Sequence, residues 1–350
     1  CANTITHYSK IFFLPTNMSS HPLPPSFNTD CLQTFMFEAS LVRGEIVHLN
    51  KAWKTIQERR QYPEVVNRHL GEMVAAGALL SATLKFDGTL ILQAQGTGPV
   101  RLLVVECTAD LKVRATIKLN PNIDTNNIPS NASLSDLINP DGKGMLVITL
   151  DPSKQQEGQQ AYQGIVPLID GDKPIETIAQ AIMVYMRNSE QLQTHIWLAS
   201  NSEYCAGILL QRLPKVGGKL VDDSKSEEDL VDDWNRLQML ANTTSNEELL
   251  GTSPETMMRR LFQEESEWQG VRSFPLRPVA FDCQCSRKRV GNMLLMLGID
   301  EVESILAEQG KVDTECDFCG QHYHFDPVDS AQLFKANNAN EGLRPAEGKH

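Results

Sequence analysis

Long hydrophobic runs are absent from the sequence. The longest apolar stretches, such as residues 293–297, are far shorter than the roughly 20 residues that a membrane-spanning helix needs. Basic charge is also scarce, because 32 Lys and Arg residues face 44 Asp and Glu residues and leave a formal net charge of -12. An acidic surface repels nucleic acids and anionic lipids. We therefore expect neither nucleic acid nor a membrane among the partners of this protein.

Cysteine is scarce and unevenly placed. Eight cysteines in 350 residues are too few for a secreted scaffold held together by disulfide bonds. Cys107 and Cys205 stand alone in the sequence, and we expect both to be small buried hydrophobic residues without chemistry. These features predict a soluble protein of the cytoplasm.

Motifs of the common enzyme classes are missing as well. The sequence contains no Gly-x-Ser-x-Gly nucleophile elbow, no phosphate-binding P-loop, no His-Glu-x-x-His helix and no dinucleotide-binding fingerprint. The segment Gly96-Thr97-Gly98 is more typical of a turn than of a phosphate site. We therefore predict that the protein is not an enzyme.

The length of 350 residues exceeds what one hydrophobic core usually organises, so more than one domain is expected. Residues 1–27 contain a Pro- and Ser-rich stretch and are predicted to be a disordered extension. The short apolar run at 11–14 lacks the basic flank and the cleavage site of a secretory signal.

Residues 28–213 alternate between strand and helix patterns, which predicts an α+β domain with an antiparallel sheet. The segment 83–93 indicates a hairpin, because Asp87-Gly88 suits a tight type I′ turn. Further strands are expected at 101–108, 112–119 and 145–150. Two helices are expected to begin after prolines, at 64–81 behind Pro63 and at 175–193 behind Pro174.

Residues 214–280 are predicted to be an acidic helical linker. Between 221 and 270, thirteen Asp and Glu residues face four Lys and Arg residues. The helix signals are the apolar spacing of Leu230, Trp234, Leu237 and Ala241, a capping box of Ser245 with Glu248, and a helix start at Ser253-Pro254. Short charged helices bury little on their own. The segment is therefore either a solvated linker or one that folds only while docked.

Four cysteines near the C-terminus form two close pairs. Cys283 and Cys285 are separated by 30 residues from Cys316 and Cys319, giving the pattern C-x-C-x30-C-x2-C. Zinc is held by four thiolates in a tetrahedron, about 2.3 Å from each sulfur. The spacing therefore predicts one zinc ion per chain bound by these four residues.

Residues 281–335 are expected to form a small zinc domain, followed by a flexible tail at 336–350. The expected elements are a helix at 287–297 ended by Gly298, a second helix capped by Asp300 with Glu303 and ended by Gly310, and strands at 311–315 and 321–325. So small a domain needs a metal to supplement its core. His322 and His324 are expected to be structural, because four thiolates already complete a metal shell. The basic run 287–289 is expected to be a solvated helix start.

Structural zinc is the usual role of such a site, and a redox switch is the alternative. Cysteines one residue apart come within reach of each other once the metal leaves, and a Cys-x-x-Cys pair oxidises with little strain. Because metal-binding energy in a small domain is largely folding energy, loss of the metal would unfold it. Spacing alone therefore favours structural zinc, and the Cys-x-Cys half shifts the balance somewhat toward a switch.

Several segments match one known family. They are Arg43-Gly44-Glu45, Tyr62-Pro63, Gln95-Gly96, Thr149-Leu150-Asp151-Pro152, Tyr162-Gln163-Gly164-Ile165-Val166, Ser189-Glu190-Gln191, Val271-Arg272, Phe281-Asp282-Cys283-Gln284-Cys285 and Cys316-Asp317-Phe318-Cys319. On these residues the chain resembles the 33-kDa chaperonins, also called redox-regulated heat-shock chaperones, over about residues 32–330.

The resemblance implies a substrate-binding domain, a metastable helical linker and a C-terminal zinc domain. It implies an ATP-independent holdase that is inactive while reduced and zinc-bound. Peroxide with heat, or hypochlorite, would form the disulfides Cys283–Cys285 and Cys316–Cys319, release zinc, unfold the linker and favour a homodimer. Unfolding client proteins would then be held until a DnaK-type system refolds them.

Two other functions make different predictions. A thiol-disulfide oxidoreductase using Cys316 and Cys319 needs a thiolate at a helix N-terminus, whereas the sequence places this pair between two strands. A zinc-dependent nucleic-acid module would bind DNA or RNA with a strong salt dependence, and the acidic composition disfavours it.

Overall fold

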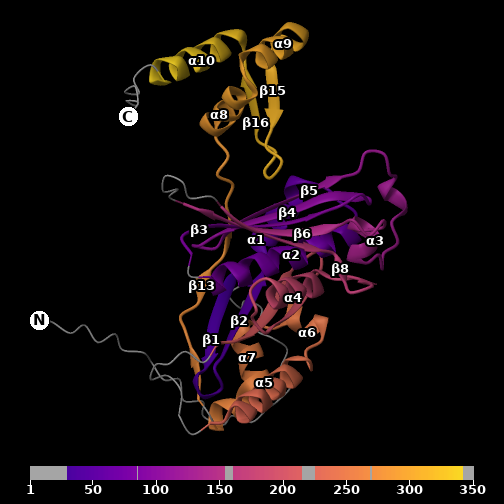
Figure 1. Ribbon diagram of the computed structural model, residues 1–350, viewed down its shortest axis with the longest axis vertical. Helices are drawn as coiled ribbons and strands as arrows, with labels where there is room; N and C mark the ends of the chain where they lie inside the picture. Colours follow the sequence, from indigo (N-terminus) through magenta and orange to yellow (C-terminus); the bar gives the residue numbers. More distant parts are fainter. Residues whose placement is uncertain (1–29, 85, 154–160, 215–224, 269, 342–350) are drawn as a thin grey trace, which may run out of the picture. The chain divides into compact units, whose positions relative to one another are not determined.

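The computed structural model describes residues 30–84, 86–153, 161–214, 225–268 and 270–341 (Figure 1). The chain forms two compact units that divide between Phe281 and Asp282. Antiparallel sheets and helices alternate along the first unit, so the predicted α+β class is confirmed. The expected extension at 1–27 lies outside the described residues.

The middle of the chain forms one of two large sheets, here called sheet II. Its strand order is β14-β5-β4-β3-β6-β7, and all neighbours are antiparallel except β14 and β5. The strands are β3 (Gly88–Gln95), β4 (Val100–Thr108), β5 (Lys112–Leu119), β6 (Met145–Pro152), β7 (Tyr162–Pro167) and β14 (Ala280–Phe281). The strands predicted at 101–108, 112–119 and 145–150 are confirmed.

Strands from distant parts of the sequence form the other large sheet, here called sheet I. Its order is β10-β11-β2-β1-β12, and β13 also pairs with β1. The strands are β1 (Cys31–Phe37), β2 (Val42–Leu49), β10 (Thr194–Ser200), β11 (Cys205–Arg212), β12 (Val271–Ser273) and β13 (Arg277–Pro278). β2 and β11 are buried along nearly their whole length, so both faces of sheet I must be covered.

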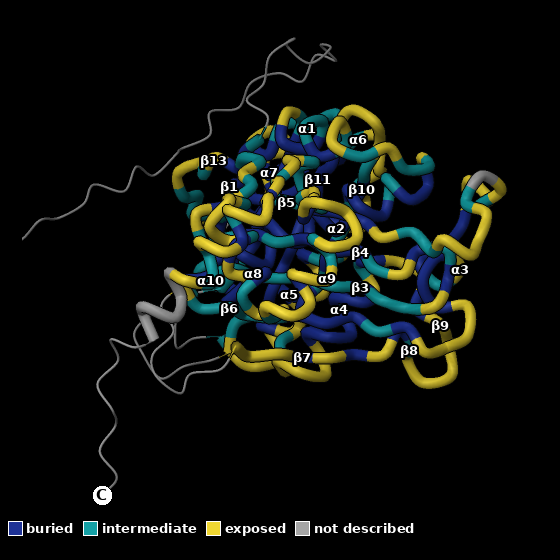
Figure 2. The backbone as a smooth tube through the Cα atoms, turned by 90° about the horizontal axis from the view of Figure 1, so that it is seen from above, coloured by how far each residue is buried: buried dark blue, intermediate teal, exposed yellow. Residues whose placement is uncertain are grey.

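Helix α2 (Glu64–Thr83) lies between the two sheets. It packs against β10 and β11 of sheet I and against β4 and β5 of sheet II. Fifteen of its 20 residues are buried, which is expected for a helix that is apolar on all sides. Gly77 permits the close approach, because a Cβ atom there would lie 2.9 Å from Cγ1 of Val105. Dark blue in Figure 2 marks the buried residues, which concentrate in these inner strands and helices.

Smaller elements complete this part of the first unit. α1 (Lys51–Arg59) and α4 (Ile178–Asn188) both contact α2. The others are η1 (Glu38–Ser40), η2 (Thr125–Asn127), α3 (Leu134–Ile138), β8 (Ile169–Asp170) and β9 (Lys173–Pro174).

Three helices of the predicted linker cover the other face of sheet I. They are α5 (Glu227–Ala241), α6 (Asn246–Gly251) and α7 (Pro254–Trp268). The ring of Phe262 on α7 lies 5.6 Å from the ring of Phe35 and 5.1 Å from that of Phe37. The apolar residues predicted on one helix face are Leu230, Trp234, Leu237 and Ala241. All four are buried, and the last three belong to the same cluster as these rings. The described linker helices are therefore docked in this structure; residues 215–224 and 269 lie outside the described part.

Polar contacts join these helices to one another and to the rest of the unit. Arg236 on α5 contacts Glu265 on α7 at 2.7 Å, and the Ser40 hydroxyl donates to Asp233 on α5 at 2.8 Å. The predicted capping box at Ser245 is half formed: the hydroxyl accepts the Glu248 N–H, but the Glu248 carboxylate pairs with Arg260 on α7 instead. The competing ion pair between two helices explains the difference.

After α7 the chain returns to the edges of both sheets. β12 and β13 pair with β1 of sheet I, and β14 pairs with β5 of sheet II. β14 ends at Phe281, two residues before Cys283. These three short strands therefore connect the docked helices to the second unit along the chain.

Two local predictions are wrong. The hairpin at 83–93 is absent, because α2 continues through Thr83 and β3 pairs with β4 and β6. The Asp87-Gly88 pair instead meets the end of β6, where Gly88 lies opposite Pro152. The helix expected at 175–193 is shorter, since Pro174 lies in β9 and Thr177 with Gln180 forms a capping box that starts α4 at Ile178. Tertiary pairing and a stronger cap override the local signals.

Other predictions are confirmed. Cys107 and Cys205 are fully buried free thiols, and the helices expected behind Pro63 and at Ser253-Pro254 are present as α2 and α7. Among the described residues, none of the helices combines the length and apolar character that crossing a bilayer requires.

Glu45 on β2 is a buried carboxylic acid, and its ionisation should make the stability of the fold depend on pH. It is 0% exposed, and within the described chain neither carboxylate oxygen has a hydrogen-bond partner. Burial raises its pKa to about 8, against the opposing charges of Arg43 and Arg277. The ordinary pKa of 4.5 applies to the unfolded chain, so the folded state holds the proton of Glu45 more tightly. The resulting contribution to the unfolding free energy is complete below pH 4.5 and is lost as the pH rises to about 8.

We expect Glu45→Gln, which keeps the shape but cannot ionise, to remove this loss. Between pH 6 and pH 8 the unfolding free energy of the wild type should fall by on the order of 2 kcal/mol from this cause, whereas that of the variant should not. Urea denaturation at both pH values measures the effect. Parallel pH dependence of the two proteins would contradict the burial argument.

Candidate metal centre

The second unit has a small hydrophobic core. Its elements are α8 (Arg287–Leu297), α9 (Ile299–Gln309), β15 (Val312–Glu315), β16 (His322–Phe325) and α10 (Pro327–Glu341). Four apolar side chains are fully buried in the described part of this unit: Leu294, Val302, Val312 and Phe325. So small a core requires an additional source of stability, such as a bound metal ion.

The predicted elements of this unit are present with three differences. α9 begins at Ile299 behind Gly298, whose φ is 94°, so Asp300 lies inside the helix and does not cap it. β15 and β16 each begin one residue later than predicted. α10 was not predicted and runs to Glu341, across the expected start of a flexible tail at 336; residues 342–350 lie outside the described chain.

Two chain segments bring the four cysteines together. Cys283 and Cys285 precede α8, which begins where the Ser286 hydroxyl accepts the Arg289 N–H. Cys316 and Cys319 lie in the turn between the antiparallel strands β15 and β16. The turn is closed by the Gly320 N–H, which donates to the Cys316 carbonyl at 2.8 Å, and Gly320 adopts a positive φ of 72°. The expected strand-turn-strand setting of this pair is confirmed.

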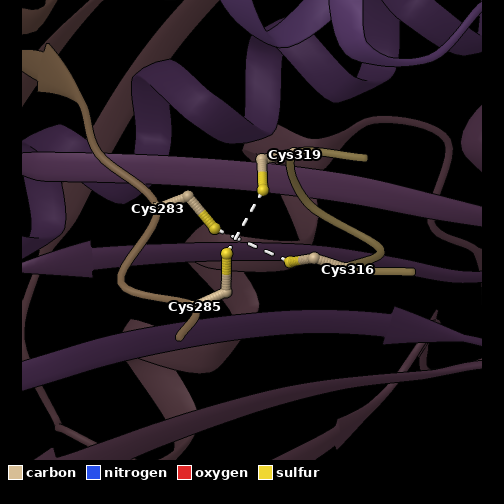
Figure 3. A group of neighbouring side chains, drawn as sticks. All are labelled: Cys283, Cys285, Cys316 and Cys319. Atoms are coloured by element: carbon tan, nitrogen blue, oxygen red, sulfur yellow. Dashed lines mark hydrogen bonds between the residues drawn. The ribbon is translucent and has the colours of Figure 1, made fainter. Parts of the chain in front are cut away.

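The four sulfur atoms form a compact group. All four Sγ atoms lie within 4.8 Å of one another, and the side chains point toward a common centre (Figure 3). Cys283 Sγ is 3.7 Å from Cys316 Sγ, and Cys285 Sγ is 3.3 Å from Cys319 Sγ. Four sulfurs placed tetrahedrally at about 2.3 Å from a metal would be about 3.8 Å apart. The group can therefore hold one metal ion after small adjustments.

The electrostatics of the group favour a cation at its centre. Burial raises the pKa of the Cys316 thiol, the backbone N–H groups of Cys319 and Phe318 oppose this rise, and the Cys283 thiol adds to it. Burial likewise raises the pKa of Cys319. Thiols that resist ionisation next to one another become thiolates readily when a divalent cation compensates their charge.

Residues around the four cysteines orient them. The Tyr323 hydroxyl donates to Cys285 Sγ at 3.1 Å, and this bond raises the pKa of Tyr323 to about 12. Sequence reasoning missed Tyr323, although alternation along β16 places it on the same face as the buried Phe325. Arg287 is more than a solvated helix start: it lies 4.2 Å from the centre of the Phe325 ring and contacts Asp329 on α10 at 2.6 Å.

His322 and His324 lie apart from the sulfur group. Their rings stack with centroids 6.3 Å apart, and Nδ1 of His324 lies 2.9 Å from the Asp313 carboxylate. Both side chains are more than half exposed. Within the described chain, the four cysteines are the group that could hold a metal ion, and it includes neither histidine.

Comparison with known proteins finds relatives along most of the chain. A family model described as "Hsp33 protein" matches residues 30–326. A 33 kDa chaperonin of Methylobacillus flagellatus is 46% identical over 307 residues, covering 87% of this chain and 94% of that protein. A 33 kDa chaperonin of Chromobacterium violaceum is 45% identical over 305 residues, with the same coverage.

A solved structure supports the fold. The crystal structure of a 33 kDa chaperonin from Thermotoga maritima matches with a TM-score of 0.67, covering 89% of this chain and 99% of that one. The sequence identity is 20%, so this match carries information on the fold alone.

Proposed function

The chain belongs to the Hsp33 protein family, and from this premise we propose that it is a redox-regulated, ATP-independent holdase and not an enzyme. It binds unfolding proteins under oxidative stress in the cytoplasm. The observation that carries the proposal is the convergence of four sulfurs within 4.8 Å in a unit with a minimal core. Such a site couples the oxidation state of its thiols to the folding of the unit.

In the reduced state, Cys283, Cys285, Cys316 and Cys319 hold one zinc ion per chain. The support is the donor set, because four thiolates in a closed tetrahedral shell are typical of structural zinc. When bound, zinc supplies the charge and the cross-link that keep the two chain segments together. Tyr323 holds Cys285 by its hydrogen bond, and Arg287 fastens α10 to the strand that carries Tyr323.

On oxidation, the sulfurs pair as Cys283–Cys285 and Cys316–Cys319. Each disulfide forms when two thiols give up two electrons and two protons, which reduce one hydrogen peroxide to two waters. We expect the Cys316–Cys319 disulfide to form first. The other pair, Cys283 and Cys285, is separated by a single residue, and a disulfide across so short a gap closes a more strained ring. Peptide mapping by mass spectrometry along a timed peroxide series measures the order.

An earlier Cys283–Cys285 bond would refute this order. The shortest sulfur contacts join Cys283 to Cys316 and Cys285 to Cys319, across the two pairs. Cross-pair disulfides in the same peptide maps would therefore refute the pairing itself.

The client-binding surface of this proposal is the face of sheet I beneath α5, α6 and α7. It carries Phe35, Phe37 and Ile46, all buried against these helices. Unfolding of the second unit frees the chain that follows the edge strands β12 to β14. The acidic helices then undock, and exposed apolar surface binds clients and a second copy of the chain. A DnaK-type system refolds the released clients.

Light scattering of a heat-denatured client tests this function. Reduced, zinc-loaded protein and peroxide-treated protein are compared side by side without ATP. We expect protection by the oxidised form alone. Equal protection by both forms would leave a chaperone without a redox switch, and protection by neither would exclude a holdase.

A further inference from the structure

Two histidines lie on the face of sheet I that the linker helices cover. His48 on β2 is 1% exposed, and its Nε2 lies 2.7 Å from the carbonyl oxygen of Leu250 on α6. The Tyr204 ring covers it from the side, with centroids 5.1 Å apart. Removal of α6 would therefore expose the imidazole and break its hydrogen bond.

His195 occupies the corresponding position beneath α5. Its ring lies 6.0 Å from the ring of Trp234 on α5 in an edge-to-face arrangement and 5.7 Å from the ring of Trp197. It is half-buried and lines a groove of about 860 Å³ between α4, β10 and α5. Undocking of α5 would leave this ring in water.

The charges around His48 do not compensate for its burial. Asp30 is the acidic group that acts on the ring, but its carboxylate accepts the backbone N–H groups of Asn50 and Ala52 at 3.1 and 2.8 Å. On the covering helices, Glu248 pairs with Arg260. Burial therefore outweighs Asp30 and lowers the pKa of His48.

The charged groups near His195 likewise do not compensate for its burial. In the groove that His195 lines, Arg187 and Asp170 pair with each other at 2.8 Å, and Lys173 contributes a further positive charge. α5 presents Trp234 and Asn235 to the same groove and no carboxylate. Burial lowers the pKa of His195.

We infer that docking of α5 and α6 on sheet I is sensitive to acid, with His48 and His195 as the sensing residues. Both rings are neutral while the helices are docked and accept a proton more readily once they are exposed. This control acts on the linker directly and requires neither loss of the metal nor oxidation of a thiol. Its consequence for client binding rests on the proposed function, whereas the pH dependence of docking does not.

The direction follows from linkage. A histidine whose pKa is lowered in the docked state favours docking above the undocked value, near pH 6.5, and loses this contribution as the pH falls below it. Between pH 7.0 and 5.5, the docking equilibrium should weaken by up to about eightfold for each histidine.

Hydrogen–deuterium exchange of the reduced, zinc-loaded full chain tests this inference. After correction for intrinsic exchange rates, peptides of α5 and α6 should exchange faster at pH 5.5 than at pH 7.0, while peptides of β3 and β4 should not. The double substitution His48→Gln with His195→Phe should abolish this dependence, because glutamine retains the donor to Leu250 and phenylalanine retains the ring. His69→Gln, on α2 at the other face of sheet I, is the matched control and should retain it.

Exchange in α5 and α6 that is independent of pH, or an unchanged dependence in the double variant, would overturn the inference. A direct titration of the two imidazoles by NMR in the wild type does not depend on how the variants fold. Both must titrate below pH 6.5, and a higher value for either would also overturn it. Acid-dependent docking without client protection at pH 5.5 would leave this inference standing and count against the proposed client surface.

Discussion

Replacement of Cys316 by serine is expected to lower the zinc content of the reduced protein from one ion per chain to less than about one tenth. A neutral hydroxyl is a poor substitute for a thiolate, and structural zinc contributes on the order of 10 kcal/mol to the folding of small domains. The second unit has four fully buried apolar side chains in its described part and cannot replace that contribution. Metal analysis and hydrogen exchange of residues 282–341 measure the two effects, and exchange there should become nearly unprotected.

The matched control is Cys107→Ala, which removes a buried thiol from β4 in the first unit. It should leave the metal content at one per chain. Full zinc occupancy in Cys316→Ser would contradict the four-cysteine site. Loss of zinc with an intact second unit would show that the metal is dispensable for folding and could not act as a latch.

Replacement of Phe262 by alanine is expected to undock the linker helices while zinc remains bound. The side chain is 0% exposed at the point where α7 departs from helical geometry, and its ring contacts Phe35 and Phe37. Loss of such a side chain costs about 3–5 kcal/mol. A docked segment of short, acidic helices has little stability in reserve. The reduced variant should therefore suppress client aggregation without any oxidant, as measured by light scattering.

Met239→Ala is the matched control, since Met239 lies on α5 and is 63% exposed. It should behave as the wild type, inactive when reduced and active after oxidation. One outcome would contradict the proposed surface: the reduced Phe262→Ala protein keeps its zinc and exchanges amide hydrogens rapidly in α5 to α7, but it does not suppress client aggregation. The face of sheet I would then not be the client surface.

Sequence patterns predicted the elements whose signals are local. The strands at 101–108 and 112–119 and the helix at 287–297 have turn residues at their ends and the expected periodicity. Elements that depend on distant partners were predicted less well. The segment that starts at Thr83 was expected to pair with the strand after Asp87-Gly88, because these two residues suit a hairpin turn. Instead, that second strand, β3, pairs with β4 and β6.

Docking of the linker was only one of two alternatives at the sequence level. Each of α5, α6 and α7 carries few apolar residues, so a single one of these helices would bury little apolar surface. The stronger signal lay in β11, whose Cys205–Gln211 stretch is buried on both faces in the structure. A strand that is apolar on both sides needs cover on both sides. α2 covers one face of sheet I, so another element had to cover the second.

The four cysteines could be predicted from their spacing because metal ligands are constrained by chemistry as well as by fold. Tyr323 and Arg287 could not, because their roles depend on how β16, α8 and α10 meet. His48 and His195 also escaped sequence reasoning. Their burial depends on helices more than 30 residues away along the chain.

The central claim is that departure of the metal and exposure of client-binding surface are one event. Zinc release, followed with a chromogenic chelator, and client light scattering are measured on the same samples during a slow peroxide titration. We predict that about one zinc ion per chain is released, and that protection rises in proportion to it. Full protection before zinc leaves, or complete zinc release without protection, would contradict the account.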